Sequence, residues 1–502
     1  MMPASRLSRC IRFLLSLALF SAAALAVITT TGCGAGSTPG PKLSGNTEVT
    51  VLLSSSANDQ LQDFQFGFTN ITLTSQSGKK VNLLTVPQGA QGAEFIHING
   101  GAEPLVTASV PQDIYTAATA GATYTYPATM VYQFSCATQL PSEIFTNTFD
   151  AVGSGYNKAT INFPGPITIT GNSMVLSLDL LVSQSETFSS CYSPSGHYTW
   201  TFTPTFNLTP LTLSSQPTNP ENGKVTGVHG EVASIDAASS TFTVSLPVEE
   251  GPETLSFGAG NATIYQGIGG FSALAVGTFV DLDAAIQSNG SLLATRIAVE
   301  DTSATNVLTG TLLSVAASNS NVTMFVREEE GASFPPEADG PWGFNFGSAV
   351  FQISGQLTNL HSLPFTPGFN GSNTVAGQNL YITAPAIGPP GEPHPYPVVR
   401  TVTLIPQTVN GTIAAISNSG SLAVYTVTLA PYDVFPTFAV QPGQKTLLTN
   451  PSQVEVYADS STQMLNSEAL AVGKTLRFNG LVFNDNGTLR MDCSQVNDGV
   501  TE

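Results

Sequence analysis

The stretch Val228-His229-Gly230-Glu231-Val232-Ala233-Ser234-Ile235 is the first of three related openings in this chain of 502 residues. Similar stretches occupy residues 307–315 (VLTGTLLSV) and residues 409–416 (VNGTIAAI). In each stretch a glycine is followed by a mixture of apolar and small or polar residues, a pattern typical of half-buried β-strands. The repeat length, about 80 to 100 residues, is too long for a solenoid and allows each unit a five- or six-stranded barrel. The stretch therefore predicts three small β-barrels in series.

Further signals recur inside the three units. A marker of small residues and glycine appears as Ala275-Val276-Gly277, Ala376-Gly377 and Ala471-Val472-Gly473. Tyr265 and Tyr457 occupy matching places before the marker in the first and third units. Those two units close with a strand, an Asn-Gly pair at residues 289–290 or 486–487, and a returning strand. Asn-Gly favours the type I′ turn, so each pair predicts a β-hairpin.

The chain before the repeats also consists of strand patterns. Ile71 and Leu73 alternate with Thr before a turn at Ser77-Gly78, and residues 175–182 have one wholly apolar face. No stretch shows a sustained apolar period of 3.6 residues, which a set of helices would require. The predicted fold class is all-β, with an N-terminal β-sandwich followed by three small β-barrel-like repeats.

Composition shifts and the repeats together predict seven segments. They are a lipoprotein-type signal peptide (1–32), a tether (33–47), a β-sandwich domain (48–212), a linker (213–224), barrel repeat 1 (225–302), barrel repeat 2 with Pro-rich insertions (303–406) and barrel repeat 3 (407–496).

The repeat pattern resembles a known bacterial family. Its parts are G-x-V-x-x-I, a Thr-rich strand, A-V-G and a hairpin that ends in residues 292–297 (LLATRI). This arrangement resembles the family called domain of unknown function 5666, most closely over residues 225–302. Residues 48–212 resemble the family called domain of unknown function 4382, found in envelope lipoproteins, through Val110-Pro111-Gln112-Asp113-Ile114-Tyr115. Neither resemblance implies an activity or a set of catalytic residues.

The N-terminus predicts export from the cytoplasm. Three arginines precede an apolar run of 16 residues, Phe13 to Ile28, which is shorter than the roughly 20 residues of a spanning helix. The following Thr30-Thr31-Gly32-Cys33 resembles the lipobox of bacterial lipoproteins and predicts lipidation of Cys33. The alternative is ordinary secretion after a cut at Ala24-Leu25-Ala26. We expect a membrane-anchored lipoprotein of the bacterial envelope, on the periplasmic or cell-surface side.

Charge limits the classes of partner. The chain has 15 basic and 34 acidic residues, and only 10% of its residues are charged. Loss of residues 1–32 removes three arginines and leaves a net charge of −22. A nucleic-acid partner is excluded on this ground, since phosphate binding requires a surplus of Lys and Arg. The negative net charge also argues against electrostatic binding of anionic lipid by clusters of basic residues. The lipid on Cys33 is therefore the predicted membrane contact.

The remaining cysteines suit an oxidising compartment. Cys136 and Cys191 fall in one predicted domain, and a disulfide between them would close a loop of 56 residues. Such a bridge is worth about 4 kcal/mol in the chain-entropy model. Two buried thiols are the alternative for this pair, and Cys493 is predicted to be a buried small hydrophobe.

The candidate ligand-binding residues lie in the second repeat. Trp342, Phe344 and Phe346 alternate beside a proline-rich insertion, and Tyr396 lies in a second one at residues 386–398. Exposed aromatic rings of this kind stack on sugars or on Pro-rich peptides. Alternation by two also describes the inner face of a strand, and this alternative stays open.

Signals for catalysis and metal binding are weak. The five histidines show no metal-ligand spacing, and Asp281 and Asp283 are predicted to form a solvated strand face, with acid–base or calcium chemistry as the alternative. We expect no metal, no cofactor and no catalytic residue. The predicted function is a non-enzymatic binding or structural module of the cell envelope, with a glycan or an envelope protein as partner. The alternative is a carbohydrate-active or other hydrolase whose carboxylates come from different strands.

Overall fold

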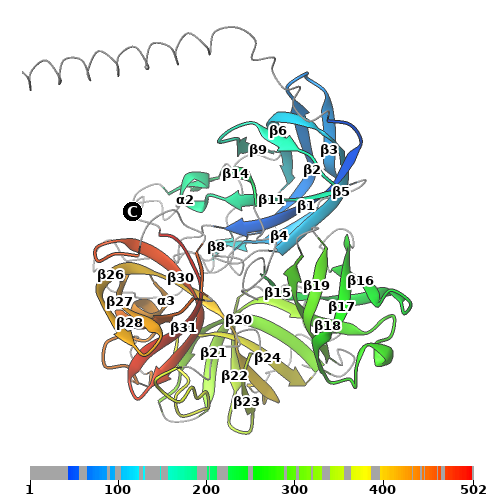
Figure 1. Cartoon of the computed structure of the whole chain (residues 1–502). Coiled ribbons are helices and arrows are strands. Elements are labelled where there is room, and N and C mark those ends of the chain that lie inside the picture. Colours follow the sequence, from blue (N-terminus) through cyan, green and yellow to red (C-terminus); the bar gives the residue numbers. More distant parts are fainter. Residues whose placement is uncertain are drawn as a thin grey trace, which may run out of the picture. The chain divides into compact units, whose positions relative to one another are not determined.

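The computed structural model describes 22 stretches of the chain. They are residues 43–55, 65–86, 91–95, 103–123, 128–129, 147–148, 157–188, 200–202, 204–211, 224–246, 253–287, 291–300, 305–317, 320–330, 340–354, 363–385, 396–431, 433–440, 444–445, 447–460, 462–464 and 470–499. The chain divides into two units, Met1–Ser44 and Gly45–Glu502, and every described strand belongs to the second unit. The all-β fold class is confirmed (Figure 1).

The first sheet has ten strands. They are β1 (Asn46–Ser55), β2 (Gln65–Ser75), β3 (Lys80–Thr85), β4 (Gln91–Glu94), β5 (Glu103–Pro111), β6 (Asp113–Thr123), β9 (Asn157–Asn162), β10 (Ile167–Ile169), β11 (Ser173–Leu180) and β14 (Thr205–Pro210). Its main path is β3-β2-β6-β9-β14-β11-β1-β5, with β4 paired to β2 and β10 paired to β6. The strands at the two ends of this path, β3 and β5, contact each other. The sheet therefore folds over one core.

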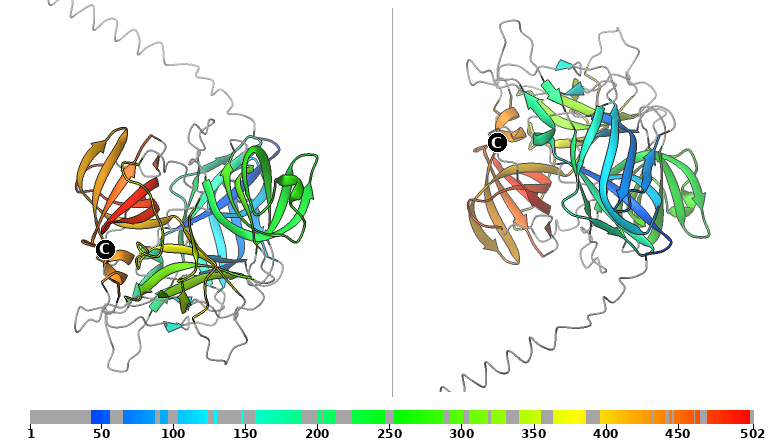
Figure 2. Two further views of the ribbon diagram at one scale, coloured as in Figure 1. Left: turned by 90° about the horizontal axis from the view of Figure 1, so that it is seen from below. Right: turned by 90° about the horizontal axis from the view of Figure 1, so that it is seen from above.

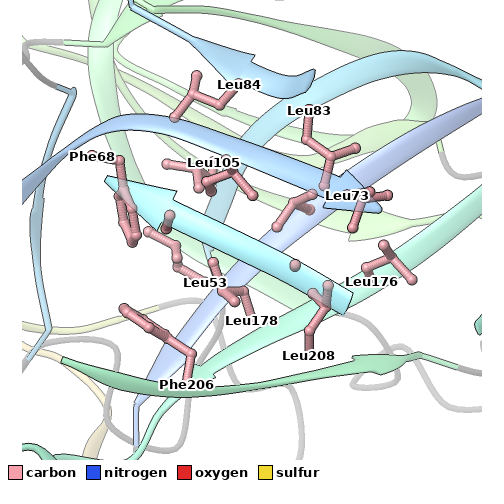
Figure 3. Close-up of a cluster of buried hydrophobic side chains, with 14 of the residues drawn as sticks. Leu53, Phe68, Leu73, Leu83, Leu84, Leu105, Leu176, Leu178, Phe206 and Leu208 are labelled. Carbon is pink, nitrogen blue, oxygen red and sulfur yellow. The ribbon is translucent and has the colours of Figure 1, made fainter. Parts of the chain in front are cut away.

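That core follows from the alternation in the sequence. Ile71 and Leu73 of β2 and Leu176, Leu178 and Leu180 of β11 are buried on the inner side of the sheet. Figure 3 shows several of these side chains pointing toward one another between the strands. The predicted turn at residues 77–78 also forms, with Gly78 at φ 83°, between β2 and β3.

Several short strands and helices lie outside the large sheets. Two pairs of short strands are β7 (Ala128–Thr129) with β8 (Asn147–Thr148), and β12 (Glu186–Phe188) with β13 (Trp200–Phe202). The helices of the described residues are α2 (Val182–Ser185) and α3 (Val434–Phe438), with a 3₁₀ turn η1 (Phe271–Ala273). No helix in these stretches has the length and apolar character needed to cross a membrane.

The first repeat is a closed barrel of five strands. They are β15 (Lys224–Asp236), β16 (Thr241–Leu246), β17 (Glu253–Gln266), β18 (Phe279–Ile286) and β19 (Leu292–Glu300). They close in the order β15-β16-β17-β19-β18, and β17 and β19 are parallel (green in Figure 1). This order is that of the OB-fold, a five-stranded Greek-key barrel.

The third repeat has the same strand order. Its strands are β26 (Gln407–Ser419), β27 (Leu422–Leu429), β28 (Gln453–Ala458), β29 (Gln463–Met464), β30 (Thr475–Asp485) and β31 (Thr488–Asp498). The path β28-β27-β26-β30-β31 is closed by a parallel pairing of β28 with β31. Figure 2 shows these strands, in orange to red, curving around their own interior.

The second repeat is a variant of this barrel. Its strands are β20 (Thr305–Val315), β21 (Asn321–Glu330), β22 (Gly340–Asn345), β23 (Val350–Ile353), β24 (Asn379–Pro385) and β25 (Thr401–Leu404). The sheet order is β22-β21-β20-β24-β25-β23, and β23 is parallel to β25. The third strand of the barrel is thus split in two, with β22 bound to the second strand and β23 bound to the fifth. The three repeats therefore share one strand order.

The glycines of the repeat motif are required by close strand contacts. Gly230, Gly310 and Gly411 occupy the same place in the first strand of their barrels, each next to the second strand. A Cβ atom on any of them would overlap a backbone carbonyl oxygen of that neighbour. Just beyond these glycines the first strand has a bulge in all three repeats.

The second motif closes the barrel onto this bulge. Gly277, Gly377 and Gly473 have positive φ, at 81°, 101° and 86°, which glycine adopts without steric cost. Their N–H groups donate to the carbonyl oxygens of Val232, Leu312 and Ile413, all at 2.7–2.8 Å. The two motifs are therefore the two sides of one contact, and this explains why both recur.

Candidate functional site

The predicted aromatic residues do not form an exposed shelf. Phe344 and Phe346 lie in the core of the second repeat, at 0% and 5% exposure, and Trp342 is partly buried against the same core. Tyr396 is 49% exposed, and its ring covers Gly343. The inner-face alternative therefore describes Phe344 and Phe346, and stacking on a ligand from solvent is excluded for both rings.

Several other predicted residues lie outside the described part of the chain. They are Cys33, Cys136, Cys191 and four of the five histidines. Cys493 is described and buried in the core of the third repeat, as predicted.

A buried ionic cluster occupies the first barrel. The solvated strand face predicted for Asp281 and Asp283 is wrong, because the two residues are only 7% and 1% exposed. Arg296 donates from Nη2 to Asp281 Oδ2 at 2.6 Å and from Nε to Asp283 Oδ2 at 2.7 Å. Burial lowers the pKa of Arg296, but the two carboxylates raise it by more, so this pKa lies above its ordinary value. Asp283 is directly opposite Arg296 in the antiparallel strand pair, and this register brings the charges together.

Tyr381 of the second repeat lies against this cluster. His229 Nε2 lies 3.5 Å from Asp281 Oδ1, and the His229 ring stacks on Tyr381, with ring centres 5.8 Å apart. Burial, with the nearby Asp281 charge, raises the pKa of Glu300 and of Tyr381. The carboxylates of Asp281 and Asp283 both accept charge-assisted hydrogen bonds from Arg296, which leaves the cluster a structural contact between repeats.

In each repeat, one equivalent position on the fourth strand contacts a neighbouring part of the chain. Asp281, Tyr381 and Arg477 occupy equivalent places on the fourth strand, opposite the residue that precedes the motif glycine. Tyr381 stacks on His229 of the first repeat, and Arg477 donates to Ser55 O of β1 at 2.9 Å. These contacts involve the fourth strand of each barrel. In many OB-folds the ligand binds on a different face, formed by strands two and three.

In the third repeat this second face is partly covered. Leu422 and Val424 of β27 and Tyr457 of β28 form a small apolar cluster, against which Leu363 and Phe365 of the second repeat pack. The Phe365 ring centre lies 5.4 Å from that of Tyr457. The segment around residue 365 of the second repeat therefore packs on the surface of the third barrel.

Arg490 connects several side chains at the edge of this surface. Its guanidinium carbon lies 5.2 Å from the ring centre of Phe365, which is within the range of a cation–π contact. Its Nε lies 3.0 Å from Asp485 Oδ2, and its Nη1 lies 3.3 Å from Glu455 Oε2. Tyr457 donates its hydroxyl to the same Glu455 oxygen at 2.8 Å. Burial, then the hydrogen bond to Glu455, raises the pKa of Tyr457 to about 12.

A pocket of about 390 Å³ lies beside this edge. The partly buried ring of Phe365 contributes to its wall, with the buried Phe483 beside it. Most of the other lining residues carry amides, hydroxyls or no side chain. The lining residues are Phe365, Thr366, Gly368, Asn370, Ser372, Asn373, Leu447, Phe483, Asn484, Asp485, Asn486 and Gly487. The predicted Asn-Gly hairpin forms here, with Asn486 at φ 51° and Gly487 at φ 93°, as a type I′ turn requires. The pocket is the candidate binding site.

Asp433 is a fully buried carboxylate at the N-terminus of α3. Its Oδ1 accepts from Phe435 N at 3.2 Å and its Oδ2 accepts from Asn410 N at 3.1 Å. Burial raises the pKa of Asp433 from 3.8 to about 7, in spite of these hydrogen bonds. The folded protein therefore holds a proton here that the unfolded chain has lost between these two pH values.

This difference predicts a pH dependence of stability. Because the folded state binds more protons, the contribution of Asp433 to the free energy of unfolding should fall as pH rises from about 4 to about 7. In Asp433→Asn we expect this fall to be absent, so the loss of stability relative to wild type should become smaller as pH rises through this window. Urea unfolding across the same pH window measures the difference from wild type. Asp236→Asn is the control, since hydrogen bonds from Ser239 and the backbone lower the pKa of Asp236. Equal slopes in wild type and Asp433→Asn would contradict the prediction.

Part of the chain matches one known protein family. Residues 229–298 match the family described as "Domain of unknown function (DUF5666)". The match covers the first barrel from His229 on β15 to Ala298 on β19, and it confirms the predicted resemblance for that repeat. For the other two repeats the shared strand order is the observation that relates them to it.

The remaining comparisons carry no functional information. No curated protein matches the sequence. One solved structure with some similarity is a tetra-tandem repeat in the extending region of a large adhesion protein, at 10% identity over 90% of this chain and 100% of that chain. Its TM-score of 0.09 shows no common fold.

Proposed function

We propose that this chain is an exported envelope lipoprotein that binds a ligand without transforming it. The observation that supports this proposal is the pocket between the second and third repeats, with the partly buried ring of Phe365 and its amide and hydroxyl groups. Binding sites for small molecules combine apolar walls with a few polar groups that fix orientation, in volumes of roughly 300–1,000 Å³. Residues between 365 and 373 of the second repeat and residues 483–487 of the third repeat form this pocket where the two repeats meet.

The hydrolase alternative has less support. Hydrolysis of a glycoside requires two carboxylates about 5 to 10 Å apart across the substrate. The lining of the described pocket contains one carboxylate, Asp485, and this group is paired with Arg490. Asp281 and Asp283, the pair singled out by the sequence, are both held by Arg296. Among the described residues no group of His, Cys, Asp and Glu side chains is arranged to hold a metal ion.

Location follows from the N-terminal sequence. We propose that Cys33 carries the lipid that holds the chain at the membrane, because the mature chain is too acidic for electrostatic binding to anionic lipid. A buried acyl chain contributes about 0.8 kcal/mol per CH₂ group.

Lipidation predicts a specific response to substitution. In Cys33→Ser we expect the protein to leave the membrane fraction and to lose metabolic labelling by a fatty acid. Cys10→Ser is the matched control, since this cysteine lies in the segment that the signal peptidase removes, and it should behave as wild type. If Cys33→Ser remained labelled and membrane-bound, lipidation at this residue would be refuted. A mature N-terminus at Val27 would indicate ordinary secretion instead.

The binding function is tested directly on the pocket. Thr366 lines the pocket and is exposed, so a large side chain can be placed there without disturbing the core. We expect Thr366→Trp to abolish binding of whichever ligand an array of glycans and envelope peptides identifies. Thr254→Trp, at an exposed position of β17 in the first barrel, is the control and should bind as wild type. A wild-type protein that binds nothing, or a Thr366→Trp variant that binds normally, would overturn the proposal.

A further inference from the structure

The pocket at the third barrel is specific enough in its chemistry to indicate a class of ligand. We infer that it takes an uncharged saccharide ring, an inference that rests on the binding function proposed above. Three features of the site support this class: its aromatic wall, its neutral polar rim and the balance of its charges.

The aromatic wall suits the apolar face of a sugar. Phe365 is partly buried and lines the pocket, and its ring is the one that can face a ligand. Phe483 is 1% exposed and supports this ring from the core, with ring centres 5.9 Å apart and planes inclined at 65°. Arg490 and Tyr457 hold Phe365 from outside the pocket. A ring held in this way loses little side-chain entropy when a ligand stacks on it. The C–H groups on one face of a pyranose can then pack against the ring as other apolar groups do.

The polar rim suits hydroxyl groups. Five side chains of the lining end in a neutral amide or hydroxyl at half-buried or exposed positions: Thr366, Asn370, Ser372, Asn373 and Asn486. Amides and hydroxyls offer both donors and acceptors. A sugar hydroxyl is itself a donor and an acceptor, so a row of such groups can pair with a saccharide and leave no charge unmatched.

The loop that carries much of the rim is already ordered by its own hydrogen bonds. Asn370 N donates to Asn373 Oδ1 at 2.7 Å, and Asn373 Nδ2 donates to Gly368 O at 2.8 Å. On the facing hairpin, Gly487 N donates to Asn484 Oδ1 at 2.9 Å. Lys445 Nζ donates to the carbonyl oxygens of residues 371 and 372 at 3.4 and 3.1 Å. A pre-formed site of this kind binds with a smaller entropic cost.

The charges near the pocket are already paired. Asp485 is the one charged residue of the lining, and its carboxylate lies 3.0 Å from Arg490 Nε. Arg490 is shared with Glu455, and the Lys445 ammonium is bound to loop carbonyls. Among the described residues around the pocket, an anionic ligand would find no unshared cation, and a cationic ligand would compete with Arg490 for Asp485. The site therefore favours a neutral ring over a uronic acid, a phosphorylated sugar or a charged peptide.

The experiment measures binding of the full-length mature protein to defined oligosaccharides. The probes are neutral hexose oligomers, N-acetylated amino-sugar oligomers, uronic-acid oligomers and envelope peptides, first on an array and then by calorimetry. We expect binding to one of the two neutral classes and no change in affinity between low and high salt, since Debye screening does not affect an uncharged ligand. Phe365→Leu, which keeps an apolar side chain but removes the aromatic face, should weaken binding about tenfold.

The possible results separate this inference from the proposed function. If the protein binds uronic acids or peptides and Thr366→Trp abolishes that binding, the pocket is a binding site and the neutral-saccharide inference is wrong. If neutral oligosaccharides bind equally to wild type and Thr366→Trp, both the inference and the pocket proposal are wrong. If wild type binds none of the probes, both are overturned. Unchanged hydrogen exchange in β27 and β28 of Phe365→Leu serves to confirm that its loss of affinity is not a loss of folding.

Discussion

Replacement of Arg296 with Met is expected to destabilise the first barrel by about 3–5 kcal/mol, the usual cost of removing one partner from a buried ion pair. Asp281 and Asp283 would stay buried with two negative charges and no cation between them. Hydrogen exchange of β18 and β19 measures the effect locally, because the amides of a destabilised barrel lose protection. Chemical unfolding of the whole chain should show an early transition that wild type lacks.

Two further variants make this prediction specific. The triple variant Asp281→Asn, Asp283→Asn, Arg296→Met has no buried charge left in the cluster, so we expect it to recover most of the lost stability. Arg400→Met is the matched control, since Arg400 is exposed and its loss should change stability by less than about 1 kcal/mol. If Arg296→Met were as mild as Arg400→Met, the cluster would contribute nothing and its burial would be in doubt.

Replacement of Gly310 with Ala is the second change with a large expected effect. The added methyl group would overlap the Phe325 carbonyl oxygen of β21, which belongs to a backbone and cannot rotate away. Strands β20 and β21 must then separate locally, at a cost of about 1–3 kcal/mol for overpacking of a core. Thermal unfolding and hydrogen exchange of β20 and β21 are the measurements.

The equivalent glycines should respond alike. Gly230→Ala and Gly411→Ala meet carbonyl oxygens of Ser245 and Thr428, so each should loosen its own barrel and leave the other two protected. Gly269→Ala is the control, because no atom lies within 4 Å of the added Cβ and we expect stability to be unchanged or slightly higher. A Gly310→Ala variant as stable as Gly269→Ala would contradict the role assigned to the motif glycine.

The repeats were predictable from sequence because their signals are local. A glycine next to a bulge, a glycine with positive φ and an Asn-Gly turn each impose one backbone geometry, whatever surrounds them. The structure shows the two glycines in the same roles in all three units, including the second, where the third strand is split into β22 and β23. In the described residues the Asn-Gly turn is seen in the third unit. The fold class and the resemblance of the first barrel followed from these patterns.

The site was not predictable in the same way. Trp342 and Phe344 alternate on β22, and Phe346 follows directly after it. Alternation defines two faces of a strand but does not tell which of them is buried. Asp281 and Asp283 are buried for a reason that their spacing does not reveal: Arg296 pairs with both carboxylates, and Tyr381 of another repeat lies near Asp281. The net charge of the chain, −19, gives no sign that these two acids are paired with one arginine.

The all-β class, the three repeats and the Asn486-Gly487 turn could be predicted from the amino-acid sequence, since these depend on residues close together in the chain. The sequence also determined the N-terminal signals on which the proposed location depends. The tertiary structure alone decided which barrel face packs on a neighbour and where the pocket lies. Phe365 and Phe483 are 118 residues apart and share a wall of the pocket only because the second repeat packs on the third. Contacts between such distant residues depend on the packing of whole barrels, and no local pattern of residues records them.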